Sequence, residues 1–115
     1  MKESQLQIAI ATYIRMQYPD VTFFSVPNEQ GYTGAKAAIY GHKLNQMGRM
    51  PGVADLFITR ANKGLHGLFI EVKTPKGKQS EWQKLFQSKI TNEGYLYVVV
   101  KDFDNAKTTI DNYLK

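Results

Sequence analysis

The sequence has 115 residues, of which 43% are hydrophobic and 22% are charged, a balance that predicts one folded domain rather than a disordered chain. It contains no cysteine, which excludes disulfide bonds, thiolate zinc sites and cysteine nucleophiles. No apolar run reaches the ~18 residues that indicate a membrane span, and the first residues lack the apolar core of a secretory signal. We therefore expect a soluble cytoplasmic protein with no membrane partner.

The charge is positive and unevenly distributed. The formal net charge is +5, and ten of the fifteen basic residues lie within residues 30–89, together with three acidic residues. A basic central segment favours a polyanionic partner, of which nucleic acid is the commonest. An ordinary solvated basic surface explains the charge alone equally well.

The first third of the chain predicts a helix and then a short strand. Ser4 and Gln7 have the spacing of a capping box at a helix start. The apolar stripe that follows consists of Leu6, Ile10, Tyr13 and Ile14. Pro19 ends this helix, and the β-branched and aromatic residues 21–26 predict a strand that ends at Pro27.

The glycine-rich residues 28–54 are harder to interpret, with a short helix expected over residues 35–46. Four residues of this stretch are candidate DNA contacts: Lys36, His42, Lys43 and Arg49. A basic loop that touches phosphates and an ordinary surface loop both remain open as interpretations.

Residues 55–60 and 68–73 predict a hairpin that turns around residues 63–64. A second capping box, Ser80 and Gln83, opens a helix. Its expected buried residues are Trp82, Leu85, Phe86 and Ile90, so Trp82 is interpreted as a core residue rather than a platform for bases.

Residues 95–100 form the most apolar strand pattern, and we expect this strand to be central in the sheet. A last helix is expected over residues 104–114. The order of helices and strands predicts an α/β fold with a central mixed β-sheet flanked by helices.

Three charged residues stand out on the hairpin. Glu71 and Lys73 share one face of a strand because alternate residues point the same way. A register that pairs odd with odd residue numbers brings Asp55 to the same face, whereas a shift of one residue separates them. Two carboxylates beside a lysine suit Mg²⁺, which prefers oxygen ligands and keeps several waters. Solvated surface charges are the alternative interpretation.

The pattern Asp55…Glu71-Val72-Lys73 resembles the PD-(D/E)xK nuclease superfamily, whose fold is that of restriction endonucleases. Residues 47–56 resemble the Gly-x-x-Gly-x-Pro-Asp-Leu approach of the VRR-NUC family, the virus-type replication-repair nucleases. Residues 71–83 resemble that family's Glu-(Val/Leu)-Lys block with its following glutamine. The similarity spans residues 3–101 in a single VRR-NUC nuclease domain over residues 1–115.

The resemblance implies roles for individual residues. Asp55, Glu71 and the Val72 backbone carbonyl would bind Mg²⁺ or Mn²⁺, and Lys73 would be the catalytic lysine. Glu3 would be an accessory acidic residue that acts on the metal directly or through water. A favourable charge at a helix N-terminus is the alternative for Glu3.

The resemblance also implies that Gln83 reaches the site, although its capping role could conflict with this. Asn28 and Glu29 resemble a polar pair that the family often shows after its first strand. One departure is Ala54, which stands where the family usually has proline; we expect activity to survive because the metal ligands are unchanged.

The implied activity is a metal-dependent, structure-specific DNA endonuclease that resolves four-way junctions as a homodimer, in a bacterial or phage-infected cell. Lys76 and Lys78 would contact phosphates near the scissile bond. Two alternatives stay open: a less selective DNA nuclease that acts on flaps, nicks or duplex, and a non-catalytic DNA-binding module of the same fold.

Overall fold

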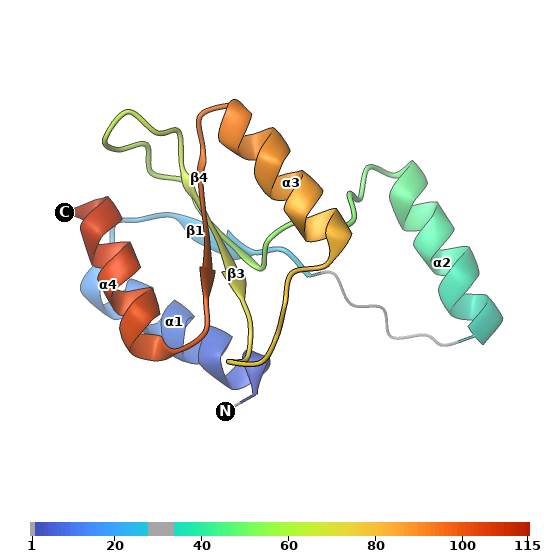
Figure 1. Cartoon of the computed structure of the whole chain (residues 1–115), viewed down its shortest axis with the longest axis horizontal. Helices are drawn as coiled ribbons and strands as arrows, with labels where there is room; N and C mark the ends of the chain where they lie inside the picture. Colours follow the sequence, from blue (N-terminus) through green and yellow to red (C-terminus); the bar gives the residue numbers. More distant parts are fainter. Residues whose placement is uncertain (1, 28–33) are drawn as a thin grey trace.

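The computed structural model describes residues 2–27 and 34–115, and over these residues it contains four helices and four strands. In chain order they are α1 (Glu3–Gln17), β1 (Phe23–Ser25), α2 (Gly34–Gln46), β2 (Leu56–Ile58), β3 (Leu68–Val72), α3 (Glu81–Asn92), β4 (Leu96–Val100) and α4 (Phe103–Leu114). The strands form one sheet in the order β1-β2-β3-β4. The β1–β2 and β2–β3 pairs are antiparallel and the β3–β4 pair is parallel. The predicted mixed sheet flanked by helices is confirmed (Figure 1).

The larger core lies between the sheet and the helices α1 and α4. It contains Leu6, Ile10 and Ile14 of α1, as the apolar stripe predicted, together with Ile110 and Tyr113 of α4 and alternate residues of β2 and β3. Tyr13 and Tyr18 both donate hydrogen bonds to Asp111 Oδ1, each over 2.6 Å. These bonds tie the end of α1 to α4 and thereby hold one face of the sheet covered.

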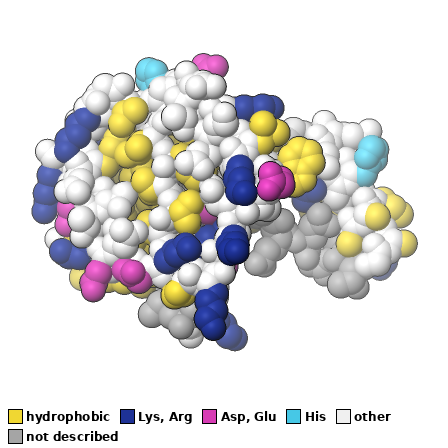
Figure 2. All heavy atoms as spheres, in the orientation of Figure 1, with side chains coloured by type: hydrophobic (Ala, Val, Ile, Leu, Met, Phe, Trp, Pro, Cys, Tyr) yellow, Lys and Arg dark blue, Asp and Glu magenta, His cyan; other side chains and the backbone are white. Residues whose placement is uncertain are grey.

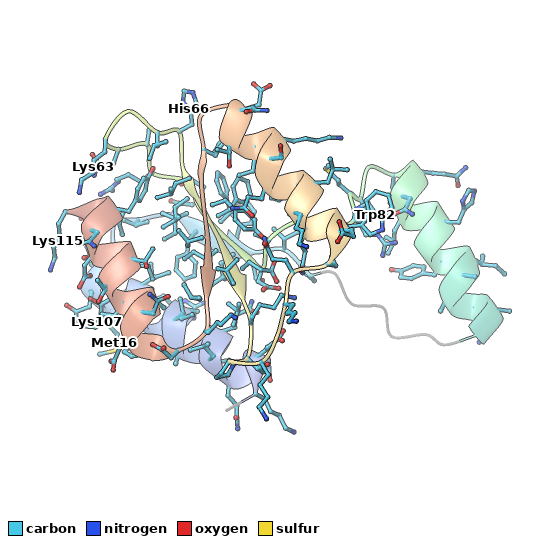
Figure 3. The ribbon with its side chains drawn as sticks, viewed as in Figure 1. Met16, Lys63, His66, Trp82, Lys107 and Lys115 are labelled. Atoms are coloured by element: carbon cyan, nitrogen blue, oxygen red, sulfur yellow. The ribbon has the colours of Figure 1, made fainter. Side chains whose placement is uncertain are left out.

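The smaller core lies under α3 on the other face of the sheet, where Phe86, Tyr97 and Ala54 are buried. The expectation that Trp82 and Leu85 belong to this core is wrong, since they are 59% and 43% exposed. Trp82 lies on the first turn of α3, which extends beyond this small cluster (Figure 3). A residue can therefore share the stripe of Phe86 and still face solvent.

The sequence predicted a central position for β4, and this prediction is wrong. The strand lies at one edge of the described sheet. Its sequence has the unbroken apolar pattern of a central strand because both faces of β4 are covered. Leu96, Val98 and Val100 pack toward the larger core, while Tyr97 and Val99 pack toward α3. An unbroken apolar run indicates that both faces of a strand are covered. It does not indicate that the strand has a neighbouring strand on both sides.

Helix α1 begins two residues earlier than the predicted Ser4–Gln7 capping box requires. Its first residue is Glu3, and the Lys2 backbone N–H donates to Gln5 Oε1 over 2.9 Å. Ser4 and Gln7 therefore lie inside the helix, and Gln5 caps it instead. The second predicted capping box is confirmed, because Gln83 N–H donates to Ser80 Oγ (3.2 Å) and Ser80 N–H donates to Gln83 Oε1 (2.8 Å).

Helix α2 stands apart from the sheet and its other helices (Figure 1). It gives the molecule an elongated shape of 46 × 32 × 27 Å. Its side chains are mostly exposed, Ile39 among them. In the described part of the chain, no helix combines the length and the apolar character that crossing a membrane requires.

Gly52 allows the segment before β2 to lie against the first turn of α3. Its φ is +86°, and an added Cβ would lie 2.4 Å from the Trp82 carbonyl carbon and oxygen.

We predict that Gly52→Ala lowers the free energy of unfolding by roughly 2–5 kcal/mol, from backbone strain and steric overlap together. Gly48 has φ +112° but open space around its Cα. Gly48→Ala should therefore cost only about 1–2 kcal/mol. Urea unfolding measures both, and equal losses would contradict the close approach.

Candidate active site

The register of the β2–β3 hairpin determines which side chains meet at the candidate site. Phe57 pairs with Phe69, so odd residue numbers face odd ones, and the next odd pair is Asp55 with Glu71. The register on which the site depended is therefore the one observed. The Val72 backbone N–H donates to Asp55 Oδ2 over 2.8 Å, and this bond holds the Asp55 carboxylate at the end of β3.

The hairpin turn lies where it was predicted, with Asn62 and Leu65 exchanging backbone hydrogen bonds of 3.0 and 2.9 Å. The two central residues, Lys63 and Gly64, have φ of +52° and +79°. Positive φ at both positions is typical of a type I′ turn, which matches the twist of the flanking strands. The Asn62–Leu65 pair joins an even to an odd number, unlike the β2–β3 pairs, so one extra residue lies on the β2 side between turn and strands.

Glu71 is the most unusual residue of the site because it is a charged residue only 2% exposed. Its Oε2 atom lies 3.6 Å from Lys73 Nζ and accepts a hydrogen bond of 3.1 Å from Gln83 Nε2. Its Oε1 atom is buried and has no hydrogen-bond partner among the described residues. A buried carboxylate oxygen without a partner is costly, which indicates that it serves a ligand.

Gln83 performs the two roles that the sequence left in possible conflict. Its Oε1 atom accepts from Ser80 N–H at the helix start, while its Nε2 atom donates to Glu71. The amide has an acceptor and a donor on separate atoms, so one side chain caps α3 and orients Glu71 at once. The position of α3 is thereby coupled to the position of Glu71.

The two carboxyl groups disfavour each other's charge. Burial, and then the neighbouring Asp55 carboxylate, raise the pKa of Glu71 to about 8. Burial also raises the pKa of Asp55, against the opposing effects of the Val72 N–H and Lys73. The pair therefore retains a proton near neutral pH and would release it to solvent when a cation binds, because the charge of the cation stabilises both carboxylates.

Glu3 lies on the same side of the molecule, since its charge contributes to the raised pKa of Asp55. It lines a cavity of about 210 Å³ together with Lys73 and Lys101. Among residues 2–27 and 34–115, however, no three His, Asp or Glu side chains come close enough together to hold a metal. Glu3 therefore does not join Asp55 and Glu71 in one cluster, and a role through water remains a prediction.

The candidate DNA contacts fall into two groups. Lys76 and Lys78 are exposed just after Lys73, on a turn closed by a 2.9 Å bond from Gly77 N–H to the Thr74 carbonyl. The other group lies on α2 and just after it, at a distance from β2 and β3, and consists of Lys36, His42, Lys43 and Arg49. Arg49 folds back on α2, where its guanidinium donates to Asn45 and to the Gly41 carbonyl. Asn28 and Glu29 lie outside the described residues.

Lys101 is a residue that the sequence interpretation missed. Val72 pairs with Val100 in the parallel β3–β4 ladder, so Lys101 follows β4 where Lys73 follows β3. It also lines a second hollow of about 410 Å³ with Lys78 and Lys84. Basic side chains gather on this face of the molecule (Figure 2). A lysine directly after an apolar strand, twice in one chain, was the available signal.

The residues present fit a divalent cation. Asp55 and Glu71 offer carboxylate oxygens at neighbouring strand positions, and Glu71 Oε1 is buried without a protein partner. Such hard oxygen donors suit Mg²⁺ or Mn²⁺. The Val72 carbonyl as a third ligand stays a prediction.

An acidic pair and a lysine on a mixed α/β sheet define a domain of the nuclease type. A family model of the VRR-NUC domain matches residues 1–102. A solved structure described as a VRR_NUC domain protein is similar with a TM-score of 0.83 and 25% identity, over 99% of this chain and 88% of that chain. No match was found among curated proteins. The chain belongs to the VRR-NUC family, as the sequence motifs predicted.

The raised pKa of Glu71 predicts a pH-dependent stability without metal. The folded protein retains a proton up to about pH 8 that an unfolded Glu releases near pH 4. The stabilisation is present at low pH and is lost as the pH rises through this window. In EDTA, the melting temperature should fall by roughly 5 °C or more between about pH 5 and 8. Glu71→Gln should have a flatter profile, and parallel profiles for the two proteins would contradict this assignment.

Proposed function

We propose that this VRR-NUC domain is a Mg²⁺- or Mn²⁺-dependent endonuclease that hydrolyses phosphodiester bonds in branched DNA, four-way junctions above all. The observation that carries this proposal is the buried Glu71 carboxylate, with one oxygen unpartnered, beside Asp55 and Lys73. Burial of a carboxyl group costs free energy. A module that only binds DNA would have no use for such a group, whereas a catalytic site would.

Asp55 and Glu71 would hold the metal ion, with the Val72 carbonyl as a third ligand. When bound, the ion supplies a positive charge to the phosphate and lowers the pKa of a water molecule. Lys73, whose side chain is 14% exposed, would position that water or stabilise the negative charge that develops on the phosphate. Gln83 keeps Glu71 oriented through its 3.1 Å hydrogen bond, and Glu3 would act through water.

DNA would be held mainly through its backbone. Lys76 and Lys78 follow Lys73 closely in the chain, and α2 would add contacts from Lys36, His42 and Lys43 at a distance from the scissile phosphate. These side chains recognise charge and shape rather than base sequence. This agrees with a preference for DNA structure.

A homodimer would supply the two centres that a symmetric cut requires. The proposed interface is a hollow of about 370 Å³ between α1 and β1, lined in part by Ile8, Ala11, Phe23 and Phe24. Ile8 and Phe24 are 66% and 50% exposed. Exposed apolar residues on an edge strand and an adjacent helix favour a protein partner there.

The test is cleavage of a labelled four-way junction, with linear duplex of the same sequence as the control, in Mg²⁺, Mn²⁺ and EDTA. We expect paired symmetric nicks on the junction in either metal and none in EDTA. Lys73→Ala should lower the cleavage rate by at least ~100-fold while it retains DNA binding. Equal cutting of both substrates would remove the junction preference, and binding without cutting in either metal would favour the non-catalytic module.

Salt dependence tests the phosphate contacts. The double variant Lys76→Ala with Lys78→Ala should weaken DNA binding and reduce the slope of log affinity against log salt by about 1–2. The matched control is Lys107→Ala with Lys115→Ala, which removes the same charge from α4 (Figure 3). A slope that changes equally in both double variants would place Lys76 and Lys78 away from the phosphates.

A further inference from the structure

Trp82 is the only tryptophan of the chain, and it is 59% exposed. Leu85, one turn further along α3, is 43% exposed. An indole ring is the largest apolar side chain, and tryptophan is enriched at interfaces where a partner covers it. The position of Trp82 in the fold indicates which partner that is.

The backbone beneath Trp82 is fixed relative to the candidate active site. The next residue, Gln83, donates a hydrogen bond to Glu71, and the Ser80–Gln83 capping box closes the helix start. On the opposite side, Gly52 lies so close that a Cβ added to it would come within 2.4 Å of the Trp82 carbonyl. The exposed ring therefore stands on a rigid base, one residue from a side chain that contacts Glu71.

The charge around Trp82 favours a polyanion. Lys84 lines the hollow that it shares with Lys78 and Lys101, beside the strand end that carries Lys73. The adjacent acid, Glu81, lies with its Oε1 atom 3.4 Å from Lys84 Nζ, so its charge is opposed. The first turn of α3 thus carries both Lys84 of this hollow and the exposed indole, and together they offer phosphate contacts and a flat apolar surface, as sites for single-stranded nucleic acid do.

We propose that Trp82 is a stacking platform for an unstacked base of the DNA that occupies the active site, at a branch point or beside it. This inference rests on the proposed DNA nuclease activity and adds a residue that selects the shape of its substrate. Bases inside a linear duplex are already stacked on their neighbours, whereas bases at a branch can be splayed out. Since every base has an aromatic face, the contact selects structure without selecting sequence.

The fluorescence of the single tryptophan reports directly on this contact. The Lys73→Ala variant, which is expected not to cut, is titrated in Mg²⁺ with a four-way junction, a single strand and a linear duplex of the same sequence. Gel shifts follow binding in parallel. We expect Trp82 emission to be quenched by the junction and the single strand, and much less by the duplex. Unchanged emission while the junction is bound would overturn the proposal.

Substitutions separate stacking from a structural role. Trp82→Ala should weaken junction binding by roughly 5- to 150-fold and leave duplex binding nearly unchanged. Trp82→Phe should restore part of the loss because it keeps an aromatic face. Leu85→Ala is the matched control, an exposed apolar residue on the same helix, and should change junction binding less than twofold. Equal effects on junction and duplex would contradict a role in shape selection.

The outcomes also distinguish this inference from the proposed function. If the wild-type protein cuts junctions and Trp82→Ala cuts them equally well, the stacking role fails and the nuclease stands. If no DNA binds and none is cut in either metal, the proposed function itself fails. A change in Trp82 emission with protein concentration alone would show that a second copy covers the ring, which would also overturn the stacking role.

Discussion

The carboxylate of Glu71, buried at the end of β3, is the constraint on which the rest of the site depends. A charged group in the interior is costly unless it is paired and hydrogen-bonded. Lys73 and Gln83 both contact Oε2, while Oε1 is left without a partner among the described residues. The hairpin register, the cap of α3 and the close approach at Gly52 all converge on this one group. Removal of any of these supports would change the surroundings of Glu71 before it changed the sheet.

The features that could be predicted from sequence were those encoded by short-range chemistry. The Ser80–Gln83 cap follows from side chains three residues apart, and the strands around Asp55 and Glu71 follow from apolar alternation and turn residues. The family motifs around these residues predicted the fold, which the structural neighbour shares. The second role of Gln83 could be expected only from the family, because its contact with Glu71 spans two elements.

The features that could not be predicted depend on what lies beside an element. The edge position of β4 is invisible in its sequence, since helices cover both faces of this strand as they would in a central one. Trp82 shares a helical stripe with Phe86, yet only Phe86 reaches the smaller core. The start of α1 lies two residues earlier than predicted because Gln5, rather than Gln7, reaches the free backbone N–H. In each case the local pattern was correct and its tertiary surroundings decided the outcome.

The loop between β2 and β3 has a consequence for how this domain can evolve. Three residues, 59–61, separate Ile58 from the Asn62–Leu65 pair, whereas two residues, 66–67, separate that pair from Leu68. A ladder that continued without interruption from the Asn62–Leu65 pair would set Asp55 opposite Val72, and the extra residue on the β2 side restores Glu71 as the opposite residue. If the turn itself is kept, loss of the extra residue would leave two residues on each side and keep Ile58 opposite Leu68, so Asp55 would stay on the face of Glu71. Relatives can therefore lack this one residue and keep the site, because the loop lies at the far end of the hairpin and the strand register, rather than the loop length, sets the face of Asp55.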